Sequence, residues 1–63
     1  MFLVVVTRNR GQLIKQCIFN SLREARQHFN QLVGDKSIGR GQVRLIERRG
    51  YAECFLLDTH ILA

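Results

Sequence analysis

The sequence predicts an α+β domain in which four strands form one mainly antiparallel sheet and a single helix packs on one face, in the order β-β-α-β-β. Three observations lead to this prediction. One helix-like segment stands in the middle of the chain, apolar and β-branched segments stand on either side of it, and turn signals divide those segments into two pairs. With 63 residues, the chain is expected to form a single domain, residues 1–63.

The central segment, Ser21–Gly34, has the pattern of an amphipathic helix. The hydroxyl of Ser21 is expected to cap the N-terminus of this helix and to stabilise the fold by about 1 kcal/mol. Glu24 is expected to complete a capping box. Gly34 is expected to end the helix in a left-handed conformation. The apolar residues that share one stripe of this helix are Leu22, Ala25, Phe29, Leu32 and Val33.

Two strands are expected before the helix. Phe2–Arg8 is rich in β-branched and apolar residues, which favours a strand. Asn9–Gly11 is a turn signal in which Gly11 can adopt a positive φ. Gln12–Phe19 is therefore expected to return beside the first strand as a hairpin.

Two more strands are expected after the helix, beyond a loop over Asp35–Gly41. Gln42–Arg48 alternates in the manner of a strand, and Arg49 and Gly50 form a tight turn. Tyr51–Asp58 is expected as the last strand, followed by a short tail over Thr59–Ala63. Because the first and last strands are the most apolar, we expect them at the centre of the sheet.

The first strand is apolar on both faces: Phe2, Val4 and Val6 alternate with Leu3 and Val5. One helix covers only one face of a sheet, and a wet face would alternate apolar with polar residues. We therefore expect the second face to be covered as well. The tail with its Ile61 and Leu62, a second copy of the chain in a homodimer, and a target protein are the three alternatives.

Basic residues outnumber acidic ones by 10 to 5, which gives a net charge of +5, and eight of the ten are Arg. The planar guanidinium suits phosphates and carboxylates, so the charge favours nucleic acid or an anionic protein surface as a partner rather than a membrane. The alternative is a solvated surface that maintains solubility. The candidate anion- or partner-binding residues are Arg8, Arg10, Lys36, Arg40, Arg44, Arg48 and Arg49.

Short connections make a further prediction about where these charges lie. If the helix runs antiparallel to its neighbouring strand, the first turn and the loop after the helix meet at one end of the domain. Arg48 and Arg49 then lie at the other end. The residues expected to form the first group, here called the basic end, are Arg8, Arg10, Lys36 and Arg40.

No arrangement of residues indicates an enzyme. Cys17, Cys54, His28 and His60 lack the paired short spacing of structural zinc ligands, so neither a metal nor another cofactor is expected. Two cysteines without a disulfide pattern fit a reducing compartment. The apolar start, MFLVVV, is too short for a signal peptide or a membrane span. We therefore expect a soluble cytoplasmic protein.

With this layout, the chain resembles small anti-CRISPR proteins of phages and mobile elements. The likeness covers nearly the whole chain as architecture: a hairpin, then Ser21–Ala25 (SLREA) opening the helix, then Gln42–Glu47 (QVRLIE), a turn at Gly50 and a final strand. It implies a non-enzymatic inhibitor that binds a host protein or ribonucleoprotein complex that handles nucleic acid. Many members are acidic DNA mimics, and the positive charge argues against such mimicry here. The alternatives are a basic protein that binds nucleic-acid phosphates non-specifically and a dimeric assembly adaptor.

Overall fold

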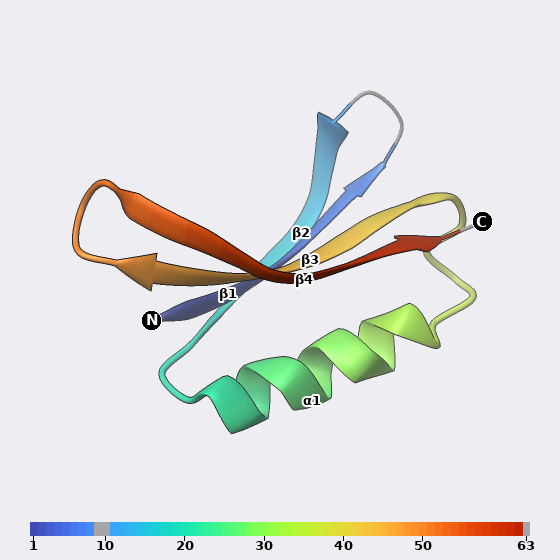
Figure 1. Ribbon diagram of the computed structural model, residues 1–63. Helices are drawn as coiled ribbons and strands as arrows, with labels where there is room; N and C mark the ends of the chain where they lie inside the picture. The colour runs from blue at the N-terminus through green and yellow to red at the C-terminus, as the bar shows by residue number, and fades with distance from the viewer. Residues whose placement is uncertain (9–10, 63) are drawn as a thin grey trace.

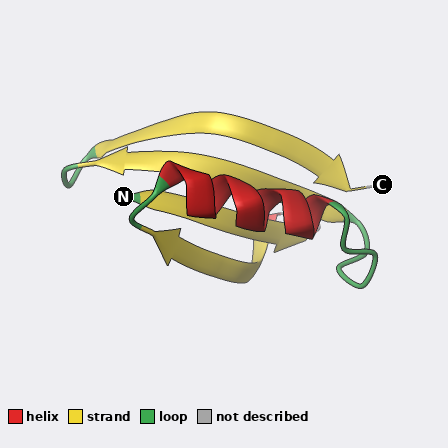
Figure 2. Ribbon diagram, turned by 90° about the horizontal axis from the view of Figure 1, so that it is seen from below, coloured by secondary structure: helices red, strands yellow, loops and turns green. Residues whose placement is uncertain are grey.

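The computed structural model, which describes residues 1–8 and 11–62, confirms the α+β layout (Figure 1). All strand pairs are antiparallel, and Figure 2 shows the helix lying across one face of the sheet. Within the part of the chain that is described, no helix has the length and apolarity needed to cross a membrane. The elements are β1 (Phe2–Arg8), β2 (Gln12–Phe19), α1 (Leu22–Val33), β3 (Gly41–Arg49) and β4 (Glu53–Leu62).

The strand order is β2-β1-β3-β4, so β1 and β3 are central and β4 lies at an edge. The prediction that the last strand is central is therefore wrong. The hairpin places β2 on one side of β1, and α1 carries the chain back so that β3 pairs with the free side of β1. The tight turn after β3 then leaves β4 the outer side of β3. β4 therefore pairs with β3 alone, and its many apolar residues are not explained by a central position in the sheet.

The tail predicted over Thr59–Ala63 is part of β4, which continues to Leu62; Ala63 lies outside the described residues. The side chain of Leu62 is buried in the core, whereas Ile61 is 73% exposed. Successive side chains of a strand point to opposite faces, so Ile61 lies on the face away from α1. The tail therefore does not fold over the second face, and that alternative is wrong.

The core lies between α1 and the sheet. Alternate residues of the two central strands are fully buried against the apolar stripe of the helix, which is the arrangement that the sequence periodicity predicts. Leu22, predicted on the same stripe, stays 43% exposed in the first turn and is not part of the core. The buried residues are Val4, Val6, Val43, Leu45 and Leu62 from the strands and Ala25, Phe29 and Leu32 from α1.

The two predicted helix caps are wrong in detail. The Ser21 side chain makes no capping hydrogen bond, and only its carbonyl accepts, from the Ala25 N–H at 3.1 Å. Gly34 adopts a right-handed conformation with φ −87° and ψ −2°. The chain instead turns through Asp35, whose Oδ1 accepts hydrogen bonds from the N–H and the hydroxyl of Ser37. Packing of the apolar stripe therefore determines where this helix lies.

Position 41, at the start of β3, needs a glycine because the backbones of two strands approach closely there. A Cβ atom at this position would meet the carbonyl oxygen of Thr7 in β1. A methyl group at Gly34 would meet nothing closer than 3.8 Å. The two glycines therefore differ in the space around them.

We expect Gly41→Ala to lower the free energy of unfolding by about 1–3 kcal/mol, because β1 and β3 must separate to accept the methyl group. Gly34→Ala is the matched control and is expected to be neutral or to raise stability by about 0.4–1 kcal/mol, since its backbone suits alanine. Urea unfolding followed by circular dichroism measures both. Equal effects of the two substitutions would contradict the close approach.

Candidate functional site

The face of the sheet opposite α1, here called the open face, carries exposed apolar side chains. Since Val4 and Leu45 point into the core, their neighbours along each strand point away from α1. Ile18 and Leu56 are 57% and 59% exposed, and Figure 1 shows α1 on the other side of the sheet. The strand register aligns four side chains across all four strands, here called the apolar row: Ile18, Leu3, Ile46 and Leu56.

Two further rows lie on the open face between the apolar row and the loop end of the sheet. Arg44 stands in the row next to the apolar row, and the third row begins with Leu13 and ends with Ile61. Among the described residues these three rows contain no carboxylate. The five acids lie on the helix side or beyond the sheet: Glu24 on α1, Asp35 in the loop, and Glu47, Glu53 and Asp58 at strand positions on the side of α1.

The side chain of Arg44 is held in place by a chain of hydrogen bonds across the open face. Its Nη2 donates to Oε1 of Gln42 at 2.8 Å, and Nε2 of Gln42 donates to Oγ1 of Thr59 at 2.9 Å. Arg44 has no carboxylate partner among the described residues. Its remaining N–H groups are therefore oriented and free to meet an anion.

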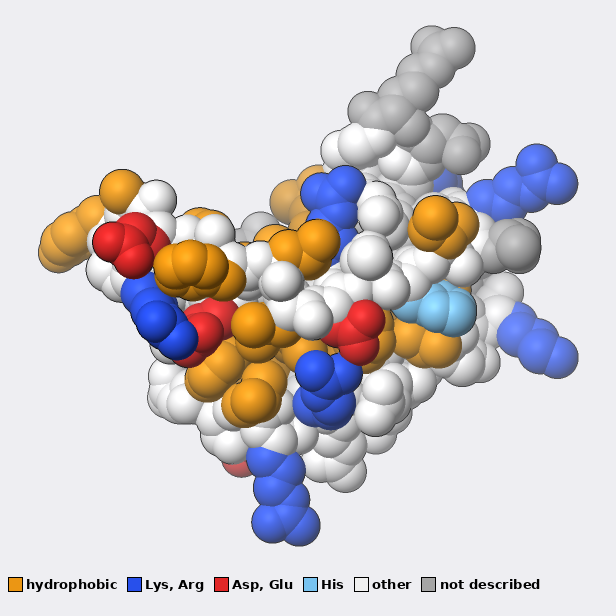
Figure 3. Space-filling model, in the orientation of Figure 1, with side chains coloured by type: hydrophobic (Ala, Val, Ile, Leu, Met, Phe, Trp, Pro, Cys, Tyr) orange, Lys and Arg blue, Asp and Glu red, His pale blue; other side chains and the backbone are white. Residues whose placement is uncertain are grey.

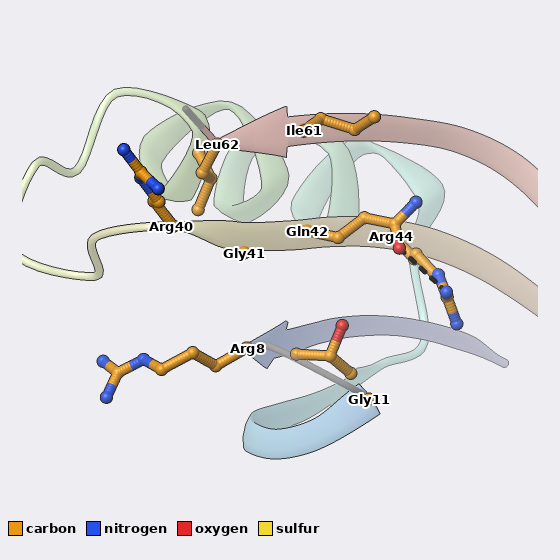
Figure 4. A pocket seen from close by; sticks show the side chains of 9 residues that line it. Arg8, Gly11, Arg40, Gly41, Gln42, Arg44, Ile61 and Leu62 are labelled. Atoms are coloured by element: carbon orange, nitrogen blue, oxygen red, sulfur yellow. Dashed lines mark hydrogen bonds between the residues drawn. The ribbon is translucent and has the colours of Figure 1, made fainter.

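A hollow of about 360 Å³ lies where the open face ends near the loop. Arg8, Arg40 and Arg44 line it together with Gly41 and Ile61. Figure 4 shows Arg8 and Arg40 extending toward the loop end of the strands, while Arg44 lies further along β3. Arg8 is anchored, because its Nη2 donates to the carbonyl oxygen of Ile38 at 3.0 Å. Three arginines thus line one recess at the end of an apolar surface, here called the arginine hollow.

The structure brings Arg8, Lys36 and Arg40 to the end of the domain where α1 ends, and Figure 3 shows Lys and Arg side chains projecting there. Arg10 lies outside the described residues. Lys36 lines a separate hollow that it shares with His60 and Leu62. Arg44 belongs to the open face and not to this end, yet it reaches the arginine hollow that Arg8 and Arg40 also line.

Arg48 and Arg49 lie at the opposite end. Arg49 forms an ion pair with Glu47 at 3.1 Å, and its guanidinium lies 5.1 Å from the centre of the Phe55 ring. The Arg48 N–H donates to the carbonyl oxygen of Met1 at 2.8 Å, which ties the N-terminus to β3. Arg49 is therefore engaged within the chain, unlike Arg44.

Two acids are committed to contacts within the chain. Arg26 donates a hydrogen bond to Asp58 at 2.8 Å, and this bond lowers the pKa of the Asp58 carboxyl. Hydrogen bonds from Ser37 lower the pKa of Asp35 in the same way. Both groups remain anionic at neutral pH and neutralise part of the helix side. The open face keeps its positive charge.

The described residues form no candidate metal centre, and comparison with known proteins gives no match. Within the described residues, no three His, Cys, Asp or Glu side chains gather closely enough to hold a metal ion. No family model, curated protein or solved structure is similar enough to this chain to count as a match. The surfaces themselves are thus the ground for a functional proposal.

Sequence reasoning missed the partners of Arg44. Gln42 and Thr59 carry no functional signal by themselves, and their contact depends on the register between β3 and β4. The apolar row also depends on register, because its members come from four different strands. The lack of apolar–polar alternation in β1 did indicate a second apolar face, and this was the available signal.

His28 on α1 adds a pH-sensitive contact near the core. Its ring lies 5.3 Å from that of Phe19, and its Nε2 is buried without a hydrogen-bond partner among the described residues. Burial, and to a smaller extent the charge of Lys15, lowers the pKa of His28. The charged form is therefore less favourable in the folded chain than in the unfolded one.

We expect the free energy of unfolding to fall as the pH drops from 7 to 5. The unfolded chain takes up a proton on His28 at about pH 6.5, and the folded chain does so only at lower pH. At higher pH, His28 is neutral in both states and does not make stability depend on pH. Urea unfolding at several pH values measures the slope, which His28→Gln should remove and His60→Gln, at an exposed position, should leave. A slope that survives in His28→Gln would assign it to another group.

Proposed function

We propose that this chain is a small non-enzymatic binding protein that docks on a protein partner through its open face. The apolar row carries this proposal. Each Å² of apolar surface that binding removes from water contributes roughly 25 cal/mol to the binding free energy. A contiguous exposed apolar patch on a small domain is typical of an interaction surface. The side chains of the row stand on four paired strands, so little conformational order has to be gained on binding.

The class of target follows from the charge and from the resemblance in layout. We propose an inhibitor of a host complex that handles nucleic acid, in the manner of the anti-CRISPR proteins that the chain resembles. Arg44 and the arginine hollow lie beside the apolar row and would meet an acidic patch of the target. No step of catalysis is required, since covering a working surface of the target is sufficient for inhibition.

We expect the double substitution Leu56→Ser and Ile61→Ser to abolish capture of a target complex from nuclease-treated host lysate. Both side chains are more than half exposed, so the loss reflects the surface and not the core. Tyr51→Ser is the matched control, because Tyr51 is 99% exposed at the β3–β4 turn and lies off the open face. Quantitative mass spectrometry should show a loss of at least about tenfold. Undiminished capture by the double variant would sink the proposal.

A second candidate function is direct, non-specific binding of nucleic acid at the basic end. The observation in its favour is that Arg8, Lys36 and Arg40 gather at one end and make no ion pair among the described residues. Positive side chains without carboxylate partners in the chain are suited to phosphate contacts. Such binding is sensitive to salt and tolerant of sequence.

We expect the triple substitution of Arg8, Lys36 and Arg40 to Ala to weaken any gel shift on random duplex DNA. Removing one cation that touches a phosphate should flatten the slope of log K against log salt by about 0.9. Arg23→Ala, which removes a positive charge on α1 away from the basic end, is the control. If the triple variant and the control keep the same slope as the parent protein, the basic end does not bind phosphates.

A further inference from the structure

We infer that the open face recognises an acidic protein segment, and that the arginine hollow receives its carboxylate. This inference rests on the proposed function and adds the chemistry of the partner. The apolar row would take apolar side chains of that segment, and the arginines that line the hollow would attract an Asp or Glu side chain. Three properties of the face support this inference: the distribution of charge, the hydrogen bonds that hold the Arg44 guanidinium, and the distance between the apolar row and the hollow.

The charge distribution separates an acidic partner from a second copy of this chain. All acids of the described chain lie away from the three rows of the open face, while Arg44 stands within them. A two-fold dimer through this face would bring the Arg44 side chains of both copies into one interface without a carboxylate from either face. Burying an uncompensated charge is costly. A partner that supplies carboxylates removes this cost.

Arg44 is also prepared to receive a carboxylate. The Thr59–Gln42–Arg44 chain uses one N–H of the guanidinium and fixes its position, which leaves other N–H groups for a partner. A guanidinium binds a carboxylate with two parallel hydrogen bonds, a geometry that lysine cannot provide. Arg8 is fixed as well, by the Ile38 carbonyl oxygen. Two of the three arginines in the hollow are therefore held before a partner arrives.

The spacing defines what the partner must present. Ile46 in the apolar row and Gln42 beside the hollow are four residues apart along β3, which corresponds to about 13 Å in a strand. A partner segment must therefore hold an apolar group and a carboxylate about 13 Å apart on one side. About nine residues of helix, or four of extended chain, cover that distance. Nucleic acid fits less well, because phosphates leave the apolar row exposed to water.

The test is selection of binders from a random peptide-display library with the purified full-length protein. We expect the recovered peptides to be enriched in Asp or Glu together with apolar residues at a fixed spacing. Individual peptides should lose at least about tenfold in affinity for Arg44→Glu, with Arg44→Gln intermediate. Arg23→Glu on α1 makes the same charge change on the helix side and should alter affinity less than about twofold. Circular dichroism of each variant confirms that it is folded.

The remaining outcomes decide against the inference in distinguishable ways. Peptides that bind the open face, as judged by loss with Leu56→Ser, but show no acidic enrichment overturn the acidic partner and leave the proposed function standing. Sedimentation that shows a dimer at tens of micromolar, dissociated by Leu56→Ser, assigns the face to a second copy. Displacement of the peptides by a short DNA duplex assigns the arginines to phosphates. A selection without any binder counts against the inference and the proposed function together.

Discussion

A single helix covers one face of a four-stranded sheet, and most of the other features of this protein depend on that constraint. The central strands β1 and β3 must serve two environments at once. Their alternate residues Val4, Val6, Val43 and Leu45 form the core under α1, and the residues between them form the open face. The described part of the chain has no further element to place on that face. The apolar residues left there are available to a partner.

Charge follows the same division between the two faces. On the helix side, Arg26 pairs with Asp58 and Arg49 pairs with Glu47, so positive and negative groups neutralise one another. On the open face, Arg44 makes hydrogen bonds to a neutral amide and meets no carboxylate among the described residues. Exposed ion pairs stabilise a fold only slightly. The separation matters more for recognition, because it presents one sign of charge beside apolar surface.

Most of the features that favour binding stand on strands, and Arg40, in the loop just before β3, is the exception. Cross-strand pairing fixes the apolar row, and the Thr59–Gln42–Arg44 hydrogen bonds fix the guanidinium beside it. The close approach at Gly41 brings β1 and β3 together where the arginine hollow begins. A surface arranged in this way loses little conformational entropy on binding. The fold therefore presents its candidate partner-binding groups in advance.

The sequence by itself determined the elements, the stripe of α1, the two apolar faces of β1 and the excess of positive charge. These properties depend on local periodicity and composition, which hydrophobic spacing records directly. Only the tertiary structure decided the strand order, the extension of β4 to Leu62, the absence of the Ser21 cap and the row that joins Ile18 to Leu56. Pairing and register are contacts between residues far apart in the chain, and a shift of one residue would move every side chain of a strand to the other face. For that reason the sequence revealed an uncovered face, whereas its pattern of apolar groups and the place of Arg44 within it required the folded sheet.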